Sequence, residues 1–191
     1  MFKVVENEVE LAQFNGVWTT VWHECGYELE FGDHVLDKNI ILTENKEVIG
    51  SNEIKCYYPD SRSYINTLAA FAQHPWVVQA EGKVGECDKV ALLKNYRGKG
   101  MYIHDILKSI CASALKHDLQ YIVSLLEPVF MKALKRLFRV PMQQVGDPFF
   151  YKGDYVVPVV MDVGFVITHK EQFTWYIENA VDREHRRVMS Q

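Results

Sequence analysis

The sequence predicts a mixed α/β fold, in which helices cover a sheet that has a parallel pair of strands near its middle. Apolar residues recur at three- and four-residue steps in residues 11–25 and 103–114, which is typical of amphipathic helices. Residues 39–58 hold two strand-like segments around a polar turn, which favours a hairpin. Residues 121–126 are almost continuously apolar and follow the second helix, as a buried parallel strand does.

The composition predicts a single globular domain over residues 1–191. The chain is 48% hydrophobic and 24% charged, and its 21 basic and 25 acidic residues give a formal net charge of −4. This balance argues against nucleic-acid binding through a dominant basic face. No apolar run approaches a length of about 18 residues, which a membrane-spanning helix needs. The first residues are acidic and lack the features of a signal peptide. We therefore expect a cytoplasmic protein.

The cysteines and histidines show no metal-binding spacing. The chain has four cysteines without a C-x-x-C pair, and seven histidines without an H-x-x-x-H or H-E-x-x-H pair. We expect reduced thiols and no bound metal.

The first half of the chain predicts a strand, a helix and a hairpin. Residues 2–5 are an apolar run long enough for one strand. The hairpin strands are residues 39–43 and 48–58, and Gly50 inside the second one indicates a bulge or a close backbone approach. The helix lies between the strand of residues 2–5 and this hairpin. Its apolar stripe is Leu11, Phe14, Trp18, Val21, Trp22 and Cys25.

An irregular insert occupies residues 59–85. A helix is expected in it only around residues 64–71. It also carries a group of large apolar side chains, Phe71, Trp76, Val77 and Val78. This group has two interpretations, the wall of an acyl-chain pocket or ordinary core, and we favour core.

The second half begins with a strand at residues 88–93, a turn with two glycines at residues 94–100, and the helix of residues 103–114. After the parallel strand, Pro128 suits the first position of a further helix. The apolar stripe of that helix is Phe130, Ala133, Leu134 and Leu137.

The C-terminal part predicts two strands and a helix. The strands are residues 143–145 and 155–160. Thr168 and Glu171 form a capping box that opens a helix over about residues 169–188. This helix either packs back on the sheet or forms the contact of a homodimer.

The turn between the strand and the helix has the features of an anion site. The first amides of a helix lack intrahelical partners and lie at the positive end of its dipole. Gly98 and Gly100 leave room beside those amides, and Arg97 and Lys99 add positive charge. The turn therefore suits an anion such as pyrophosphate, with a basic surface turn as the alternative.

Known loop motifs narrow the choice of anion. A Walker loop has Ser or Thr after its lysine, where this chain has Gly100 after Lys99, and a G-x-G-x-x-G loop has glycine where this chain has Ile103. The remaining match is the R-x-x-G-x-G/A loop, with Arg97, then Gly98 and Lys99 as spacers, and Gly100. In this loop and in the order of its elements, the chain resembles the GNAT acyltransferase family.

The resemblance implies a GNAT-like sheet that is mixed and mostly antiparallel, with helices on both faces and a central parallel pair splayed to admit CoA. It implies acetyl-CoA or another acyl-CoA as co-substrate, with the backbone of residues 92–94 on the pantetheine arm. The implied cofactor-binding residues are Leu92, Leu93, Lys94, Arg97, Gly98, Lys99, Gly100, Met101 and Tyr102.

The chain departs from the family pattern at three positions. Tyr102 stands where the family prefers Gly or Ala, Lys94 replaces a usual proline, and Leu134 replaces a tyrosine that often protonates the leaving thiolate. The substitutes for that acid are Tyr102, Tyr121 and Tyr151. The segment of residues 145–162 looks like the branch of N-acyl amino acid synthases and acyl-homoserine lactone synthases.

The implied reaction moves an acyl group, by default acetyl, from a CoA thioester to a small-molecule primary amine by direct attack. The amine is protonated at neutral pH, so a base must take a proton. Glu86 and Asp88 are two residues apart in a strand and share a face, so either is a candidate catalytic base. Their alternative interpretation is a pair of solvated acids at a strand end.

Two other functions stay open. One is an enzyme of the same fold that moves a longer chain, from acyl-CoA or an acyl-carrier protein, to an amino acid-like amine. The other is a non-catalytic module that senses CoA or acyl-CoA, which the departures above motivate. An acidic carrier protein needs a basic docking face, and the candidates for it are Lys132, Lys135, Arg136 and Arg139.

Overall fold

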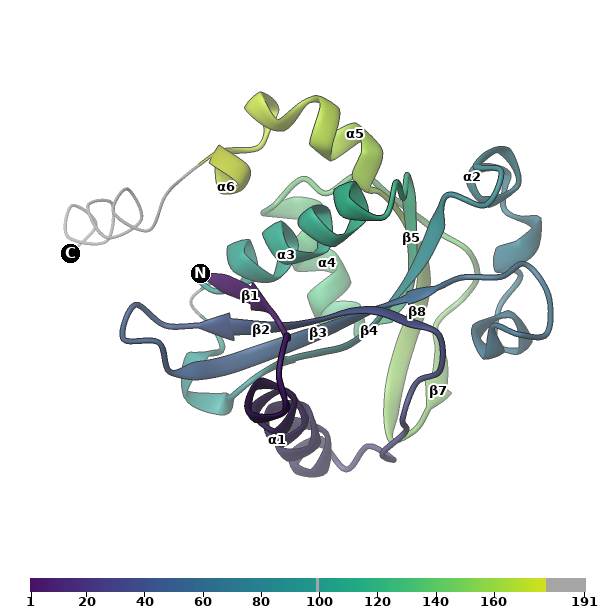
Figure 1. The fold of residues 1–191 in the computed structure, drawn as a ribbon. Coiled ribbons are helices and arrows are strands. Elements are labelled where there is room, and N and C mark those ends of the chain that lie inside the picture. Colours follow the sequence, from purple (N-terminus) through teal and green to yellow (C-terminus); the bar gives the residue numbers. More distant parts are fainter. Residues whose placement is uncertain (99, 178–191) are drawn as a thin grey trace.

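The computed structural model describes residues 1–98 and 100–177, which form an eight-stranded sheet with helices on both faces (Figure 1). The strand order is β1-β2-β3-β4-β5-β8-β6, and β7 pairs with β8. Among the described strands, β4 and β5 are parallel and the other neighbours are antiparallel. This confirms the predicted mixed, mostly antiparallel sheet with a central parallel pair.

The N-terminal half of the sheet contains a longer β4 than the sequence predicts. β4 starts at Val84 rather than at residue 88, so Glu86 and Asp88 lie inside the strand. Gly50 makes the expected close approach, because a Cβ there would lie 2.7 Å from Leu92 Cδ2. The four strands are β1 (Phe2–Val4), β2 (Val35–Leu42), β3 (Val48–Cys56) and β4 (Val84–Leu92).

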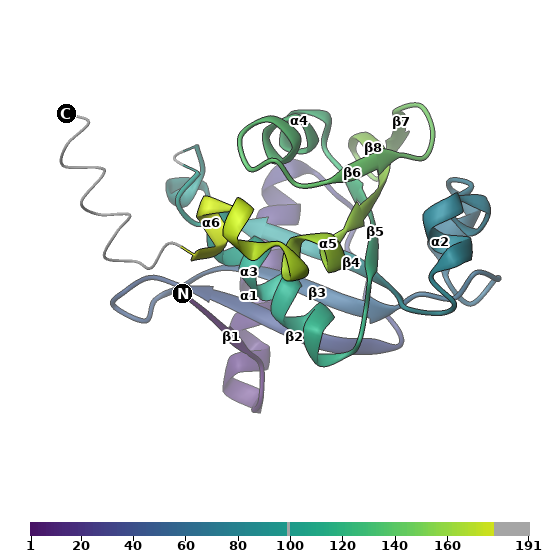
Figure 2. The same cartoon turned by 90° about the horizontal axis from the view of Figure 1, so that it is seen from above.

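The C-terminal half of the sheet contains one strand that the sequence analysis missed. This strand, β7, has three residues and forms a hairpin with the start of β8, so its pattern is too short to recognise (Figure 2). The strands of this half are β5 (Tyr121–Leu126), β6 (Met142–Gln144), β7 (Phe149–Tyr151) and β8 (Asp154–Asp162).

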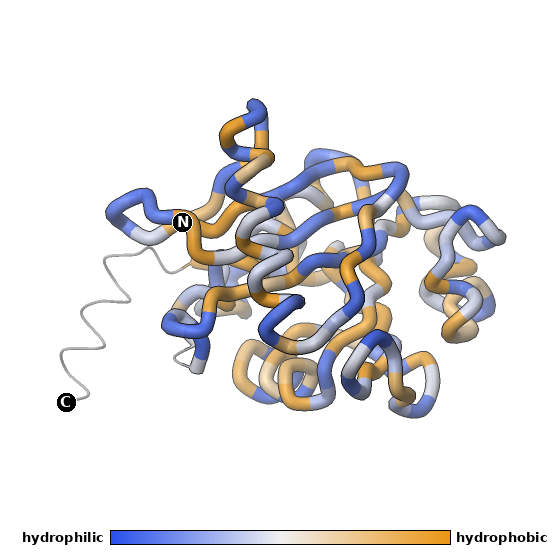
Figure 3. The backbone as a smooth tube through the Cα atoms, turned by 90° about the horizontal axis from the view of Figure 1, so that it is seen from below, coloured by the Kyte–Doolittle hydropathy of each residue, from blue (hydrophilic) through white to orange (hydrophobic). Residues whose placement is uncertain are grey.

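Helices α1 (Glu8–Cys25) and α3 (Ile103–Lys116) cover opposite faces of the sheet (Figure 1). Phe14 and Trp18 of α1 are fully buried against β2 and β4, and the apolar face of α3 packs on the other side of the sheet. Helix α4 (Pro128–Arg136) joins that second core through Leu134. The turn between β2 and β3 lies at the edge of the sheet and is largely hydrophilic (Figure 3).

The insert contains no α-helix at residues 64–71, so the helix predicted there is corrected to short 3-10 segments. It forms two 3-10 turns, η1 (Tyr64–Thr67) and η2 (Phe71–Gln73), and the short helix α2 (Pro75–Gln79). The Asn66 side chain donates to the carbonyls of Tyr58, at 2.8 Å, and of Asp60, at 2.9 Å. Such side-chain bonds to the backbone compete with helix formation.

The predicted capping box at Thr168 is also wrong. Thr168 is the last residue of α5 (Val163–Thr168), which Asp162 caps by accepting from the Phe165 amide at 2.8 Å. A 3-10 turn, η4 (Lys170–Gln172), and the helix α6 (Thr174–Ile177) follow. The rest of the helix expected to end near residue 188 lies outside the described residues. No described helix is long and apolar enough to cross a membrane.

Candidate functional site

The two parallel strands separate soon after they meet. β4 and β5 pair over three positions, from Val84 opposite Tyr121 to Glu86 opposite Val123. One further link follows, in which Ser124 Oγ donates to the Cys87 carbonyl at 2.9 Å. Beyond it β4 stays paired with β3 while β5 turns away with β8 (Figure 1). The strand edges that face each other across this opening have no strand partner there among the described residues.

A cavity of about 700 Å³, which we call the cleft, fills this opening. It extends from the glycine turn before α3, along β4, to Glu86. Its other walls come from the loop after α1, from the insert and from α4. The residues that line it and that matter below are Lys55, Glu86, Asp88, Lys89, Arg97, Gly98, Gly100, Tyr102, Ser124, Val129, Leu137 and Tyr151.

The glycine turn lies at one end of the cleft. Gly98 and Gly100 have φ of 87° and 66°, in the left-handed region that glycine adopts without strain. A Cβ at Gly98 would meet nothing within 4 Å, and a Cβ at Gly100 would meet only Phe138 Cζ, at 3.6 Å. The turn therefore leaves open space beside the N-terminus of α3, as a pyrophosphate requires. Lys99 lies outside the described residues.

Arg97 holds the turn against its neighbours. Its Nε donates to the Leu92 carbonyl at 2.6 Å, and its Nη2 lies 3.1 Å from Glu24 Oε2 of α1. The Leu93 amide donates to the Ile49 carbonyl on β3 at 2.9 Å. Lys94 begins a 3-10 turn, η3 (Lys94–Tyr96), after the end of β4. The structure thus pairs the Leu92 carbonyl and the Leu93 amide within the protein.

The acid pair lies at the other end of the cleft and is bridged by a lysine. Lys55 Nζ is 2.7 Å from Glu86 Oε1 and 3.2 Å from Asp88 Oδ2. The side chains of Glu86 and Lys55 are 12% and 14% exposed, and that of Asp88 is 28% exposed. The two carboxylates are therefore not solvated acids at a strand end.

Burial and charge shift the pKa values of this group. Burial raises the pKa of the Glu86 carboxyl above its usual value, and Lys55 opposes only part of that effect. Burial alone lowers the pKa of Lys55, but the charges of Asp88 and Glu86 outweigh it, so its pKa lies above the usual value. Lys55 thus stays protonated at neutral pH, while Glu86 is a stronger base than an exposed glutamate.

A bulge in β4 places a second lysine beside the acid pair. Opposite β3 residues 51–53, β4 uses residues 88–91, one more than regular pairing requires, and Lys89 has a φ of 49°. Ser51 Oγ donates to the Lys89 carbonyl at 3.0 Å, and the Lys89 amide donates to Asp88 Oδ1 at 2.7 Å. These bonds stabilise the bulge.

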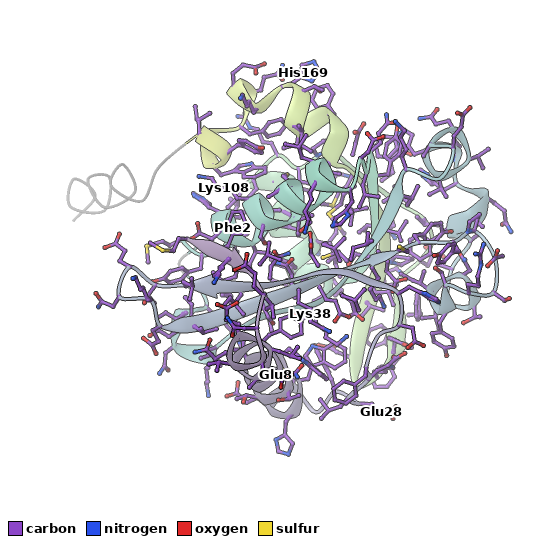
Figure 4. The ribbon with its side chains drawn as sticks, in the orientation of Figure 1. Phe2, Glu8, Glu28, Lys38, Lys108 and His169 are labelled. Carbon is purple, nitrogen blue, oxygen red and sulfur yellow. The ribbon has the colours of Figure 1, made fainter. Side chains whose placement is uncertain are left out.

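The Lys89 ammonium is almost fully buried against Glu53. Its Nζ is 2.5 Å from Glu53 Oε1, 4.0 Å from Asp88 Oδ2 and 5.3 Å from the centre of the Trp18 ring. Lys38 Nζ lies 3.9 Å from Glu53 Oε2 and extends from β2 toward α1 (Figure 4). Lysines and carboxylates therefore alternate across β2, β3 and β4. The order of contacts is Lys38, Glu53, Lys89, Asp88, Lys55 and Glu86.

Several side chains considered from the sequence do not reach the cleft. Phe71 and Val77 are buried in a separate core with Trp76, which stacks on Tyr121, and Val78 is exposed. Phe71, Trp76 and Val77 are thus core, as favoured above, and Val78 is not; the insert residues that do line the cleft are Tyr64, Ile65 and Leu68. Leu134 is buried in the core, and the Tyr121 hydroxyl accepts from Gln79 at 2.8 Å.

Two of the three candidate tyrosines line the cleft. Tyr102 lies next to the glycine turn, with its ring 5.6 Å from that of Tyr96. Tyr151 comes from β7, and burial raises its pKa to about 12. Both therefore remain candidates for the acid.

The sequence analysis missed Lys55, Glu53 and Lys89. Each lies at an ordinary position of a charged strand, and their pairing depends on the β3–β4 register and on the bulge. One signal was present in the strand-like segment of residues 48–58, which contains Glu53 and Lys55. Charged residues that are buried in a strand need charged partners on the neighbouring strands. No group of three or more described His, Cys, Asp and Glu side chains is suited to hold a metal ion.

Comparison with solved structures identifies the fold. No family model matches the chain, and no curated protein does. FeeM, an N-acyl amino acid synthase from uncultured soil microbes, is similar at 16% identity and a TM-score of 0.64, over 85% of this chain and 89% of FeeM. The CoA-dependent acyl-homoserine lactone synthase MesI is similar at 12% identity and a TM-score of 0.63, over 94% of this chain and 97% of MesI.

A third similar structure, from Lactobacillus plantarum, is assigned as an N-acetyltransferase. It shares 12% identity and a TM-score of 0.62 with this chain, over 85% of this chain and 97% of its own. The chain therefore has the fold of the GNAT acyltransferases and of the acyl synthases that share it. This confirms the resemblance seen in the sequence at the level of the fold.

Proposed function

We propose that the protein is an N-acyltransferase that moves an acyl group from a CoA thioester to a small-molecule primary amine. The observation that carries the proposal is the cleft itself, which joins the open glycine turn at α3 to the Glu86–Asp88 pair along the unpaired edge of β4. A thioester whose pyrophosphate lies at the turn would extend along this edge toward the acid pair. The three similar structures support acyl transfer through their shared fold.

The proposed donor site uses the residues that the sequence singled out, except Leu93 and Lys94. Gly98 and Gly100 admit the pyrophosphate to the N-terminus of α3, where Arg97 and Lys99 supply charge and residues 101–102 complete the wall. The pantetheine arm would bond to free backbone groups of β4 on its β5 side. That stretch ends at Leu92, because the Leu93 amide already bonds to β3.

The proposed reaction needs one proton acceptor and no covalent enzyme intermediate. The ammonium of the acceptor binds at Glu86 and Asp88 and gives up a proton to a carboxylate, directly or through water. The free amine nitrogen then bonds to the thioester carbonyl carbon, the C–S bond breaks to release the thiolate, and the nitrogen loses its second proton to solvent or to that thiolate. Of the two acids, Glu86 is the better base because burial raises its pKa, and Asp88 is the more accessible to the ammonium.

The leaving thiolate needs little assistance. Its thiol has a pKa of about 8.5, so water can protonate it. The charges of Asp88, Lys55 and Glu86 all reach the Tyr151 hydroxyl, so this tyrosine lies close enough to the acid pair to act on the same substrate. We propose Tyr151 as the acid if a side chain supplies the proton.

A second donor, an acyl-carrier protein with a longer chain, is favoured by one feature of α4. Its cations Lys132, Lys135 and Arg136 are exposed, as is Arg139 just after it, and none has a carboxylate partner among the described residues. Val129 and Leu137 of the same segment are 78% and 77% exposed and line the cleft. Such a basic surface beside an apolar cleft wall suits an acidic carrier with an acyl cargo.

The proposal is tested by ligand binding followed by turnover. The protein is titrated in thermal unfolding with CoA, acetyl-CoA and C8 to C16 acyl-CoAs, with ATP as control. A ligand at a hundred times its Kd stabilises the folded state by about 2.7 kcal/mol, which is readily measured. Thiol release is then followed with a panel of amines. Stabilisation by ATP alone refutes the donor site, and tight CoA binding with no turnover for any amine favours the sensor instead.

A further inference from the structure

Lys55 is the cation that joins the two carboxylates of the cleft. It stands directly opposite Glu86 in the β3–β4 register, and Asp88 follows two residues later on the same face. Both contacts are within 3.2 Å, and the lysine side chain is only 14% exposed. Water and salt therefore screen its charge weakly.

Within residues 1–98 and 100–177, Lys55 is the one cation paired with both carboxylates. Lys89 is 4.0 Å from Asp88 and already forms a close pair with Glu53. Without Lys55, the buried Glu86 and the adjacent Asp88 would be like charges in a poorly solvated site, and such a pair retains a proton. The other titratable groups that interact electrostatically with these carboxyls, from β3, the segment after it, β4 and β7, are Glu53, Tyr57, Cys87 and Tyr151.

We propose that Lys55 is a positioning residue of the acyl transfer, which keeps Glu86 and Asp88 both negatively charged and in place along the cleft so that a protonated amine binds there. This inference rests on the proposed function. It assigns the ammonium of the acceptor to a site with two carboxylates and one fixed cation. The net charge of this trio is −1, and a bound ammonium makes it neutral. The site therefore takes amines in their protonated form and discriminates against neutral nucleophiles such as alcohols.

The first test is the pH dependence of kcat/KM for the amine in three variants. Lys55→Met removes the charge but keeps a long side chain, Lys55→Arg keeps the charge, and Lys38→Met removes the lysine at the far end of the alternating series. In Lys55→Met the acid limb of the profile moves to higher pH by one unit or more, so activity falls about tenfold at a pH below that limb and recovers above it. Lys55→Arg and Lys38→Met keep the limb of the wild type.

The KM for the thioester separates this role from damage to the donor site. Because Lys55 contacts the acids and not the glycine turn, the thioester KM stays within about twofold in Lys55→Met. A structural role alone predicts a different result, in which turnover falls by the same factor at every pH. That result, or an unshifted limb, overturns the inference. Lys55→Gln gives the same comparison if the Met variant does not fold.

The second test needs no substrate. Carbon-13 NMR follows the titration of the side-chain carboxyls, and Glu86→Gln and Asp88→Asn identify the two signals. In Lys55→Met the titration of the pair moves up by at least one unit, while the exposed Asp118 does not move. If the wild type acylates no amine, the proposed function fails, but this titration still decides whether Lys55 controls the charge of the pair.

Discussion

The buried ion pair between Glu53 and Lys89 gives the sharpest stability prediction. In Lys89→Met, Glu53 keeps a side chain that is 1% exposed and loses its partner at 2.5 Å, and Lys38 at 3.9 Å is left as its nearest cation. Breaking one member of a buried pair costs about 3–5 kcal/mol. For a chain of this length, about 2–4 °C is lost per kcal/mol, so the unfolding midpoint falls by about 6–20 °C. Methionine has the same backbone strain as lysine at a φ of 49°, so the change measures the charge.

Two further variants separate charge from packing in this experiment, which is read by thermal and urea unfolding. Glu53→Met combined with Lys89→Met removes both charges and restores most of the lost stability, because an apolar pair of similar volume can replace an ion pair. Lys83→Met, whose partner Asp118 is 83% exposed, costs less than about 1 kcal/mol. The reasoning is refuted if Lys89→Met costs as little as Lys83→Met, or if the double variant is no more stable than Lys89→Met alone.

Three other predictions concern the cleft. Asp88→Asn lowers kcat/KM for the amine by about 10²–10⁴ at neutral pH, while the thermal shift caused by the thioester stays the same. An equal loss of turnover and of thioester binding would contradict the assignment of Asp88 to the amine acceptor. Gly100→Ala strains the backbone and weakens CoA binding. The control is Gly26→Ala, because Gly26 at the end of α1 has a similar φ of 74°: this variant loses a comparable free energy of unfolding but binds CoA like the wild type. Arg136→Glu raises the KM for an acyl-carrier donor several-fold at low salt and leaves the KM for acyl-CoA unchanged. The control Lys170→Glu, on η4, changes neither KM. If the two variants raise the KM for the carrier equally, α4 is excluded as the docking surface.

Local sequence patterns were enough to predict the glycine turn that lies at one end of the cleft. The glycine turn works through backbone conformation and the exposed amides of a helix, and both follow from residues that are adjacent in the chain. Gly98 and Gly100 adopt the left-handed φ that other residues avoid, so their presence in the sequence already indicated the turn. The helix of residues 103–114 and the strand of residues 121–126 were recognised for the same reason, since their periodicity is local.

The sequence was a weaker guide where polar side chains bond to backbone groups nearby in the chain. Residues 64–71 have a helical pattern, but side-chain bonds from Asn66 to the backbone hold them in 3-10 turns. Thr168 and Glu171 have the spacing of a capping box, but Asp162 caps an earlier and shorter helix. In both places a hydrogen bond to a side chain a few residues away outweighed the pattern that the sequence suggested.

By itself the sequence determined the class of fold, the glycine turn before a helix and the two acids on one face of a strand. Only the tertiary structure decided what surrounds those acids. The bulge at Lys89 and the register of β3 against β4 bring Lys55 to Glu86 and Lys89 to Glu53 across more than thirty positions of the chain. The physical reason is that a carboxylate's charge state depends on burial and on charges within a few ångströms, and both are set by which strands become neighbours.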